Sequence, residues 1–494
     1  MLELTNATAV SRREIPALAA DAFRSALGDA LRGGARLGAL FGREGAAGEA
    51  ILTAVVNDDG VGASRVVEAR VRGGYPSLTS EWPEAQAFER ELFEETGVVP
   101  EGHPWLKPLR FPPRPGGEGA ASIPGAYPYF AVEGEEVHEV AVGPVHAGVI
   151  EPGHFRFQCH GERVLHLEIQ LGWQHRGVEE LLRGGPTKRT LSIVETLAGD
   201  TTIGHATAHC ELLEALSGGV APPRAQALRG VALELERLAN HVGDLGALAG
   251  DVGFLPSASF LGRLRAEFLN ATAEICGSRF GRGLLVPGGV RFDVGSEAAA
   301  ALAVRVEKAV RSVQAAADLF FDAPSVRGRT DGVGVVAPAL AASLGLVGPA
   351  ARACGLARDV RRDHPSGIYR FAYLPAVLAQ HGDVFSRAWI RLLEAERSAA
   401  FVAQQLRSLP GGPVRVALGS LAPDRLALSL VEGWRGEICH VALTGADGRF
   451  ERYDVTDPSV HNWLGLAMAL RGEQISDFPL CNKSFNLSYA GHDL

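Results

Sequence analysis

The chain has 494 residues, of which 46% are hydrophobic and 21% are charged, so it can form two or more domains with sizeable apolar cores. A formal charge of -9, without a long run of Lys or Arg, argues against nucleic acid or another polyanion as a partner. The N-terminus lacks the basic, then apolar, then small-residue order of an export signal, which favours a cytoplasmic protein.

The first 110 residues carry the pattern of a small α+β domain. Residues 50–71 are two β-branched runs around Asp58, Asp59 and Gly60, which predicts a hairpin. Residues 80–97 predict a helix that is capped by Ser80 and ends at Gly97. The following segment, 111–135, begins with a stretch dense in Pro and Gly and is predicted to be a linker.

The second predicted domain, residues 136–494, is mainly helical with a small antiparallel sheet. Residues 145–173 alternate apolar and polar side chains, which indicates strands, and the helical period takes over near residue 174. Helical patterns cover 235–245, 296–321 and 384–409, and strand-like runs return over 413–445. The fold class is therefore predicted to be α+β. There is no phosphate-binding glycine motif of the P-loop or dinucleotide type.

Cysteine spacing and apolar runs give two further expectations. The longest uncharged stretch, residues 332–351, contains several glycines and prolines, so a membrane-spanning helix is not expected and any membrane would be reached through a partner. No two cysteines have chelating or disulfide-loop spacing, which predicts reduced, buried thiols at 159, 210, 276, 354, 439 and 481.

Histidines mark three candidate sites. If a helix begins near Gln174, His175 faces Glu179 and Arg176 faces Glu180, which alone would indicate two surface pairs. His205 and His209 have the spacing of two zinc ligands on a helix, but no Glu stands between them as in zinc hydrolases. Two histidines with hydrogen-bond partners inside a helical core are the favoured interpretation.

A loop bounded by Gly-Pro and Pro-Gly turns carries His146 and His154. Loops carry functional residues more often than cores do. These two imidazoles are therefore candidates for a binding role.

Eight ordered segments resemble one known family. They are GPVHAGVIEPGHFRF, QLGWQHRGVEELL, ELERLANHVGDLG, VPGGVRFD, GPAARACGLARDVR, GDVFSRAWIRL, VEGWRGE and DPSVHNW. Their order resembles the large subunits of group 4 [NiFe] hydrogenases, of the hydrogenase-4 and formate hydrogenlyase type, and the 49-kDa subunit of respiratory complex I. Residues 85–110 resemble the end of the 30-kDa subunit of complex I, which is fused to the large subunit in the hydrogenase-4 type.

The resemblance implies that the nickel ligands are missing. Such hydrogenases hold nickel and iron with two Cys-x-x-Cys pairs, because soft thiolates suit these metals. Aligned on Glu195 and His205, the first pair falls on Ala198 and Thr201; the second falls on Ser488 and Gly491. No metal site is therefore expected in this chain, and hydrogen activation is not expected at these positions.

By the same resemblance, the emptied cavity would take a quinone, as in complex I. His146 and His154 would approach the quinone, and His175 and Arg176 would face a [4Fe-4S] cluster in a partner subunit. Asp200, Thr201 and Thr202 are polar enough to contact the headgroup, but none of them matches the family residue. One departure from complex I is that the segment around Asp200 has no Tyr as hydrogen-bond donor. The implied partners are a cluster-binding small subunit similar to the 20-kDa subunit of complex I, a ferredoxin-like subunit and antiporter-like membrane subunits. The chain would lie peripherally on the cytoplasmic side of the cell membrane.

Four functions stay open at this stage. The first is an electron-transfer subunit of a hydrogenase-like or NADH:quinone oxidoreductase-like complex, active only within that complex. The second is a catalytically silent scaffold of such a complex. The third is a genuine [NiFe] hydrogenase, and a standalone zinc enzyme is a distant fourth.

Overall fold

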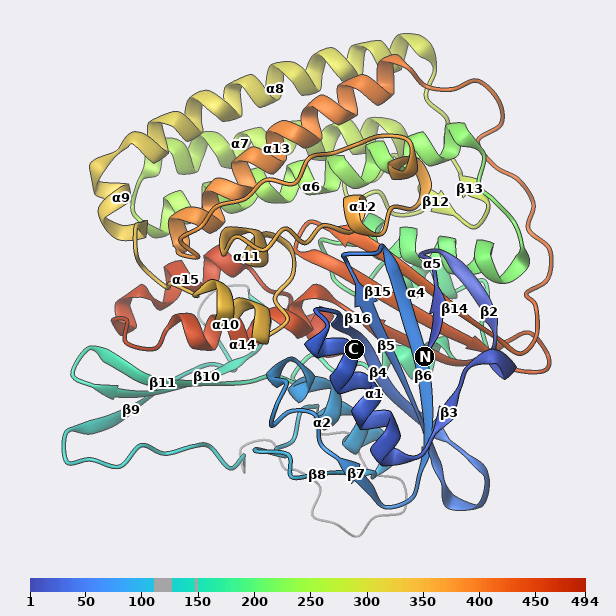
Figure 1. Cartoon of the computed structure of the whole chain (residues 1–494). Coiled ribbons are helices and arrows are strands. Elements are labelled where there is room, and N and C mark those ends of the chain that lie inside the picture. Colours follow the sequence, from blue (N-terminus) through green and yellow to red (C-terminus); the bar gives the residue numbers. More distant parts are fainter. Residues whose placement is uncertain (111–126, 147–149) are drawn as a thin grey trace.

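The computed structural model describes residues 1–110, 127–146 and 150–494 and has the predicted α+β fold, with a layer of long helices above antiparallel sheets (Figure 1). The N-terminal sheet has the strand order β1-β6-β5-β4, and β3 pairs with β6. Its elements are β1 (Leu2–Leu4), β3 (Ala17–Leu18), α1 (Ala20–Arg32), β4 (Arg36–Glu44), β5 (Ala50–Asp58), β6 (Ala63–Val71) and α2 (Gln86–Thr96), with the short pair β7 (Gly74–Pro76) and β8 (Val99–Glu101) beside it.

The predicted hairpin over 50–71 is confirmed, since β5 and β6 pair antiparallel up to Asp58 and Ala63. Gly97 ends α2 in the left-handed conformation, with a φ of 73° that favours glycine. Ser80 is not the cap that the sequence predicts, because α2 begins only at Gln86. The buried carboxylate of Glu89 instead accepts hydrogen bonds from the segment before the helix, including the backbone N–H of Leu78 at 2.8 Å.

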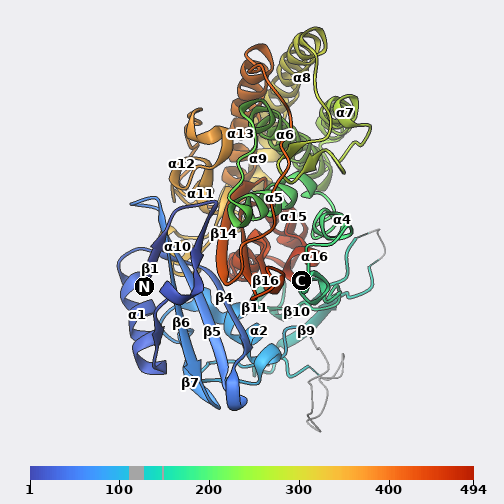
Figure 2. The same cartoon turned by 90° about the vertical axis from the view of Figure 1, so that its right-hand side faces the viewer.

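A second antiparallel sheet lies in the middle of the molecule, between the N-terminal sheet and the long helices (Figure 2). It consists of β2 (Thr8–Ser11), β14 (Arg425–Gly433), β15 (Gly436–Thr444) and β16 (Phe450–Thr456), in the order β16-β15-β14-β2. Strand β14 starts only at Arg425, so the strand prediction over 413–424 is wrong. The N-terminal segment contributes β2 to this sheet, and the predicted domain boundary at residue 110 stays a prediction.

Side chains of the second sheet alternate between two different cores, as a period of two requires. Leu426, Leu428 and Leu430 pack with residues of the N-terminal sheet. The opposite face packs with α5 (Thr202–Ser217), to which Ala427 and Ala442 turn. Both faces are therefore buried, and His440 lies on the same side as Ala442.

The helical layer consists of α6 (Pro223–Asp251), α7 (Leu255–Cys276), α8 (Ser296–Asp322) and α13 (Val384–Arg407). Leu235, Leu238, Val242 and Leu245 are at most 1% exposed, which confirms the predicted apolar face. Residues 332–351 contribute to two short helices instead of one long one, as expected.

In the described ranges, no helix is long and apolar enough to span a bilayer. The shorter helices and the β12–β13 pair are α3 (Val178–Leu182), α4 (Thr190–Val194), α9 (Pro324–Thr330), α10 (Pro338–Ser343), α11 (Gly348–Ala353), α12 (Val360–Asp363), β12 (Leu285–Val286) and β13 (Gly289–Val290).

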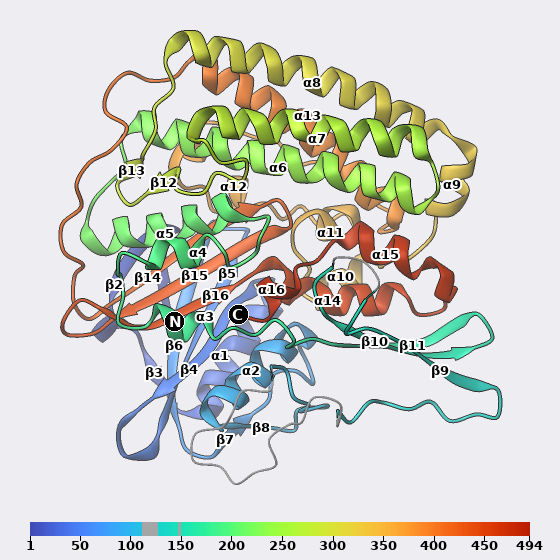
Figure 3. The same cartoon turned by 180° about the vertical axis from the view of Figure 1, so that it is seen from behind.

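The third sheet is the predicted small antiparallel one, and it projects from the body (Figure 3). It consists of β9 (Val137–Val142), β10 (His154–His160) and β11 (Arg163–Gln170), with β10 in the centre. The C-terminal helices α14 (Pro458–Ala469), α15 (Phe478–Phe485) and α16 (Tyr489–His492) lie at its base. Most of the predicted linker lies outside the described residues. The cysteines are unpaired, and all except the half-buried Cys276 are buried as predicted.

Candidate functional site

Two segments that are far apart in the sequence meet at Arg435, in the turn between β14 and β15. The Arg435 guanidinium donates to both carboxylate oxygens of Asp200, at 2.6 and 2.8 Å. Its Nε donates to the carbonyl oxygen of Asn486, in the C-terminal segment. The loop before α5 and the C-terminal segment therefore form one site around this guanidinium.

The polar side chains of the loop before α5 have hydrogen-bond partners. The Trp434 indole N–H donates to the Thr201 hydroxyl at 3.1 Å, and this hydroxyl donates to Asp200 at 3.2 Å. Ala198 is fully buried, and Thr201 is 2% exposed. Burial would raise the pKa of Asp200, but the Arg435 guanidinium outweighs it and lowers this pKa. Asp200 is therefore an anion held by a buried cation.

The C-terminal segment is packed closely against the start of α14. The Ser488 hydroxyl accepts a hydrogen bond from the Gly491 N–H at 2.9 Å, and the Ser488 N–H donates to Ser459. Gly491 lies so near Asp457 that a Cβ at residue 491 would stand 2.6 Å from the Asp457 carboxyl carbon. A larger side chain at residue 491 therefore requires Asp457 to move.

The loop that carries His146 and His154 is held by reciprocal hydrogen bonds. His146 Nε2 lies 3.1 Å from the Gly153 carbonyl oxygen, and His154 Nδ1 lies 2.9 Å from the Gly143 carbonyl oxygen. Among the described residues, His154 Nε2 is buried without a hydrogen-bond partner. Gly153 touches the Tyr489 ring, and Glu151 accepts a hydrogen bond from the Tyr489 N–H at 3.1 Å. The structure thus brings this loop onto the C-terminal segment.

His175 and Arg176 lie at the edge of the same region, but not as the helical spacing predicts. Helix α3 begins at Val178, so the predicted pairs of His175 with Glu179 and Arg176 with Glu180 are wrong. His175 Nδ1 lies 3.1 Å from the Leu494 carbonyl oxygen. The exposed Arg176 donates to the carbonyl oxygens of Thr196 and Leu197, both at 2.9 Å.

His205 and His209 both lie inside the core on α5, as the favoured interpretation of the sequence has it. Their rings do not converge on one point, since His205 contacts His440 and Asp457 whereas His209 contacts Tyr453. Each of these five residues is at most 1% exposed. This network joins the site to the interior of the second sheet.

Comparisons with known proteins match the chain to subunits of respiratory complexes and hydrogenases. A family model of the 49 Kd subunit of respiratory-chain NADH dehydrogenase matches residues 251–425, and a model of its 30 Kd subunit matches residues 55–118. The chain is 33% identical to the carbon monoxide-induced hydrogenase of Rhodospirillum rubrum, over 71% of this chain and 97% of that protein. It is 31% identical to formate hydrogenlyase subunit 5 of Escherichia coli K12, over 85% of this chain and 77% of that protein. The chain belongs to the group 4 hydrogenase and complex I large-subunit family.

A solved structure shares the fold of this large-subunit family member. It is a chain of the membrane-bound sulfane sulfur reductase, an archaeal respiratory membrane complex, with a TM-score of 0.68 and 23% sequence identity. The alignment covers 73% of this chain and 99% of the solved chain. The match to the 30 Kd model also confirms the resemblance that residues 85–110 carry.

Glu236, on α6, is a further ionisable group of this large subunit next to Asp200. Its carboxylate accepts hydrogen bonds from the backbone N–H groups of Ile203 and Gly204, at 2.7 and 3.1 Å, in the first turn of α5. Burial raises the pKa of Glu236 to about 8 although these bonds lower it, and the Asp200 charge adds to the rise. Glu236 is therefore largely protonated at neutral pH.

Sequence reasoning missed Arg435, Asp457, His440 and Tyr453 as members of the site. Arg435 and Asp457 stand in the segments VEGWRGE and DPSVHNW, which carry the family resemblance, so their motifs could have indicated them. His440 and Tyr453 stand in ordinary strand patterns, and only the packing of the sheet against α5 brings them to the site.

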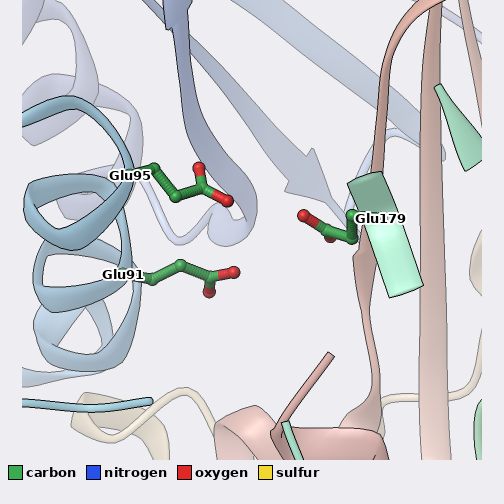
Figure 4. A group of neighbouring side chains, drawn as sticks. All are labelled: Glu91, Glu95 and Glu179. Carbon is green, nitrogen blue, oxygen red and sulfur yellow. The ribbon is translucent and has the colours of Figure 1, made fainter. Parts of the chain in front are cut away.

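Three carboxylates gather away from this site, between α2 and α3 (Figure 4). Glu91, Glu95 and Glu179 have carboxylate oxygens within 4.8 Å of one another. Arg452 donates to Glu95 and Glu179 at 2.9 Å, and Arg110 donates to Glu91 at 2.6 Å. Burial, opposed by Arg110 and reinforced by the other two carboxylates, raises the pKa of Glu91 to about 8. The cluster is an ion-pair network that joins α2 to the second sheet.

Proposed function

We propose that the chain is the electron-transfer subunit of a membrane-associated, complex I-like oxidoreductase and has no nickel–iron centre. In this proposal it forms an acceptor site for a quinone or a similar molecule, next to a [4Fe-4S] cluster of a partner subunit. Relatives named as subunits of NADH-quinone oxidoreductase and F(420)H(2) dehydrogenase support a role in such a complex.

The observation that carries the proposal is which side chains stand at the four positions where the family resemblance places the metal ligands. Ala198, Thr201, Ser488 and Gly491 offer no thiolate, and nickel and iron require soft donors there. The ion pair of Arg435 with Asp200 bridges the two segments to which these positions belong. A nickel–iron centre does not fit these residues, so no step of the proposed reaction passes through one.

A polar acceptor suits the groups that remain. Asp200, Thr201 and Arg435 offer charged and hydroxyl contacts for a quinone headgroup. His154 adds a buried ring nitrogen that has no partner in the described part of the chain, on the loop that packs against the C-terminal segment. Reduction of a quinone consumes two electrons and two protons, and the protein supplies positioning, hydrogen bonds and protons for it.

The surroundings of the site support the partners proposed with it. His175 and the exposed Arg176 would face the cluster of a small subunit similar to the 20-kDa subunit of complex I. Donors and positive charge near a cluster raise its reduction potential. A ferredoxin-like subunit and antiporter-like membrane subunits would complete the complex, with this chain on the cytoplasmic side of the membrane.

Quinone reduction by the isolated intact complex tests the proposal. His146→Ala should abolish most of the turnover, because it removes an imidazole from the proposed quinone loop. His160→Ala is the matched control, since His160 lies on the adjacent strand and pairs with Glu136 at the surface. Equal activity of both variants and wild type would overturn the assignment of the loop.

A scaffold without turnover is the second candidate, and two observations favour it. Asp200 is already neutralised by Arg435, and both loop histidines bond to the backbone of their own loop. A labelled quinone analogue separates the two candidates. Saturable labelling of the loop that carries His154 supports the acceptor site, whereas a complex that never binds the analogue supports the scaffold.

A further inference from the structure

Five protonatable side chains form an unbroken hydrogen-bonded chain between α5 and the second sheet. Asp457 Oδ2 lies 3.2 Å from His205 Nε2, and His205 Nδ1 lies 3.0 Å from His440 Nε2. His440 Nδ1 lies 2.9 Å from the Tyr453 hydroxyl, which lies 2.9 Å from His209 Nδ1. Both nitrogens of His205 and of His440 are therefore engaged within the chain.

One arrangement of protons satisfies every link. Asp457 is a carboxylate, because His205, Arg435 and the Ser459 N–H at 2.8 Å hold its pKa below its usual value, so His205 carries its proton on Nε2. His205 Nδ1 must then accept from His440 Nε2–H. His440 Nδ1 accepts from the Tyr453 hydroxyl, and that oxygen accepts from His209 Nδ1–H. Every hydrogen bond in the chain is therefore donated in the direction of the Asp457 carboxylate.

The surroundings keep two of the three imidazoles, those of His209 and His440, neutral, as this arrangement requires. All five side chains are buried, and Leu212, Phe450 and Ala442 lie in the same apolar cluster as Tyr453. Burial lowers the pKa of His209 to about 4. Burial, with His205 and His209 adding to it, also lowers the pKa of His440 well below its usual value. A neutral imidazole that accepts on one nitrogen and donates from the other can pass a proton on.

The carboxylate end of the chain lies at the proposed acceptor site. Asp457 touches Gly491, one of the four family ligand positions. Burial alone would raise the pKa of Asp457, but His205, Arg435 and the Ser459 N–H lower it. At the other end, His209 lies four residues after His205 on α5, about 6 Å farther along the helix axis.

We propose that His209, Tyr453, His440, His205 and Asp457 form a proton relay that supplies the acceptor site. His209 takes up a proton at Nε2 and gives its Nδ1 proton to Tyr453, whose own proton moves to His440 Nδ1. The Nε2 proton of His440 moves to His205 Nδ1, and the Nε2 proton of His205 moves to Asp457. Asp457 then gives this proton to the reduced acceptor and becomes a carboxylate again. Turning of the hydroxyl and of the imidazole rings restores the first arrangement.

This inference rests on the proposed function for the fate of the proton, but the relay itself can be measured without an acceptor. Each passage moves one proton, and the two electrons of the acceptor come from the partner's cluster. Tyr453→Phe removes the hydroxyl that links His440 to His209 and keeps the ring. Tyr75→Phe is the matched control, because the Tyr75 hydroxyl is equally buried and donates to Glu89 at 2.9 Å in the N-terminal domain.

The first experiment follows exchange of the His440 Nε2–H with solvent, by nitrogen-15 spectroscopy of the full chain labelled at histidine. A relay predicts that Tyr453→Phe slows this exchange by about tenfold or more, because the buried proton loses its path. A purely structural network predicts faster exchange, because the loss of a buried hydrogen bond loosens the region. Unchanged or faster exchange in Tyr453→Phe overturns the relay, and Tyr75→Phe should match wild type.

The second experiment measures quinone reduction by the intact complex in water and in deuterium oxide. Tyr453→Phe should lower turnover by about tenfold or more and raise the solvent isotope effect, whereas Tyr75→Phe should change neither. Wild-type turnover and isotope effect in a folded Tyr453→Phe complex would contradict delivery of protons to the acceptor. A wild-type complex that reduces no quinone would overturn the proposed function, and the exchange rates would still decide whether the relay exists.

Discussion

Arg435 holds Asp200 through two hydrogen bonds, at 2.6 and 2.8 Å, although 235 residues separate them in the sequence. The Arg435 side chain is 5% exposed, and that of Asp200 is 34% exposed. The same guanidinium reaches the Asn486 carbonyl oxygen. This ion pair joins the loop before α5 to the C-terminal segment, and it gives the site its fixed charges.

Asp200→Asn should destabilise the chain, because the buried guanidinium of Arg435 loses its counter-charge. The expected loss is about 1–3 kcal/mol of unfolding free energy, measured by denaturant unfolding at neutral pH. Adding Arg435→Gln to Asp200→Asn should cost less than the sum of the two single changes. Strict additivity would show that the two side chains do not act as a pair.

Gly491→Ala should also destabilise the chain, because the new methyl group would stand 2.6 Å from the Asp457 carboxyl carbon. Overpacking of this kind costs about 1–3 kcal/mol. Gly199→Ala is the control in the other segment of the site, where a Cβ has no atom within 4 Å. Equal unfolding free energies of the two variants would show that the packing of Gly491 against Asp457 is looser than described.

Glu236 should make stability depend on pH between about 5 and 8. Burial raises its pKa in the folded state to about 8, well above the usual value of a glutamate, so the folded state keeps a proton that the unfolded state has released. The contribution of Glu236 to stability is therefore present below the unfolded pKa and is lost as the pH rises through the folded pKa. Glu236→Gln should reduce the fall in Tm between pH 6 and pH 8.

The matched control for this pH dependence is Glu297→Gln, which changes an exposed carboxyl in the first turn of α8. This variant should keep the wild-type difference in Tm. If Glu236→Gln shows the same difference as Glu297→Gln, Glu236 does not hold the proton.

In the proposed function Arg176 faces the partner's [4Fe-4S] cluster, so Arg176→Gln removes a positive charge there and should shift the cluster's reduction potential to a more negative value. The potential is measured by a redox titration of the intact complex, followed by electron paramagnetic resonance. Arg183→Gln is the control, because Arg183 is also exposed but pairs with Glu180 at 3.0 Å. A potential that stays at the wild-type value would remove Arg176 from the cluster-facing surface.

The sequence indicates those parts of the fold that local patterns control. Alternation over 50–71 predicts the β5–β6 hairpin, and the helical period predicts the buried face of α6 around Leu238. The start of α3 is missed because Gly177 adopts a left-handed φ of 61° just before it. Glu179 is then used by Arg452, a partner 273 residues away that no local pattern reveals.

The candidate site likewise has one part that local motifs indicate and another that depends on tertiary packing. Motif order points to Asp200, Thr201, Ser488 and Gly491, and the structure joins their two segments through Arg435. The chain from Asp457 to His209 depends on which face of a strand His440 takes and on how α5 packs against that face. Spacing along the sequence reveals neither the strand face of His440 nor the packing of α5. The network can therefore be recognised only in the tertiary structure.

The most direct test of the account is the metal content of the intact complex while it reduces quinone. The account predicts quinone reduction with no stoichiometric nickel, and with iron that the partner's iron–sulfur clusters explain in full. One nickel atom per copy of this chain, bound between the segments of Thr201 and Ser488, would contradict it.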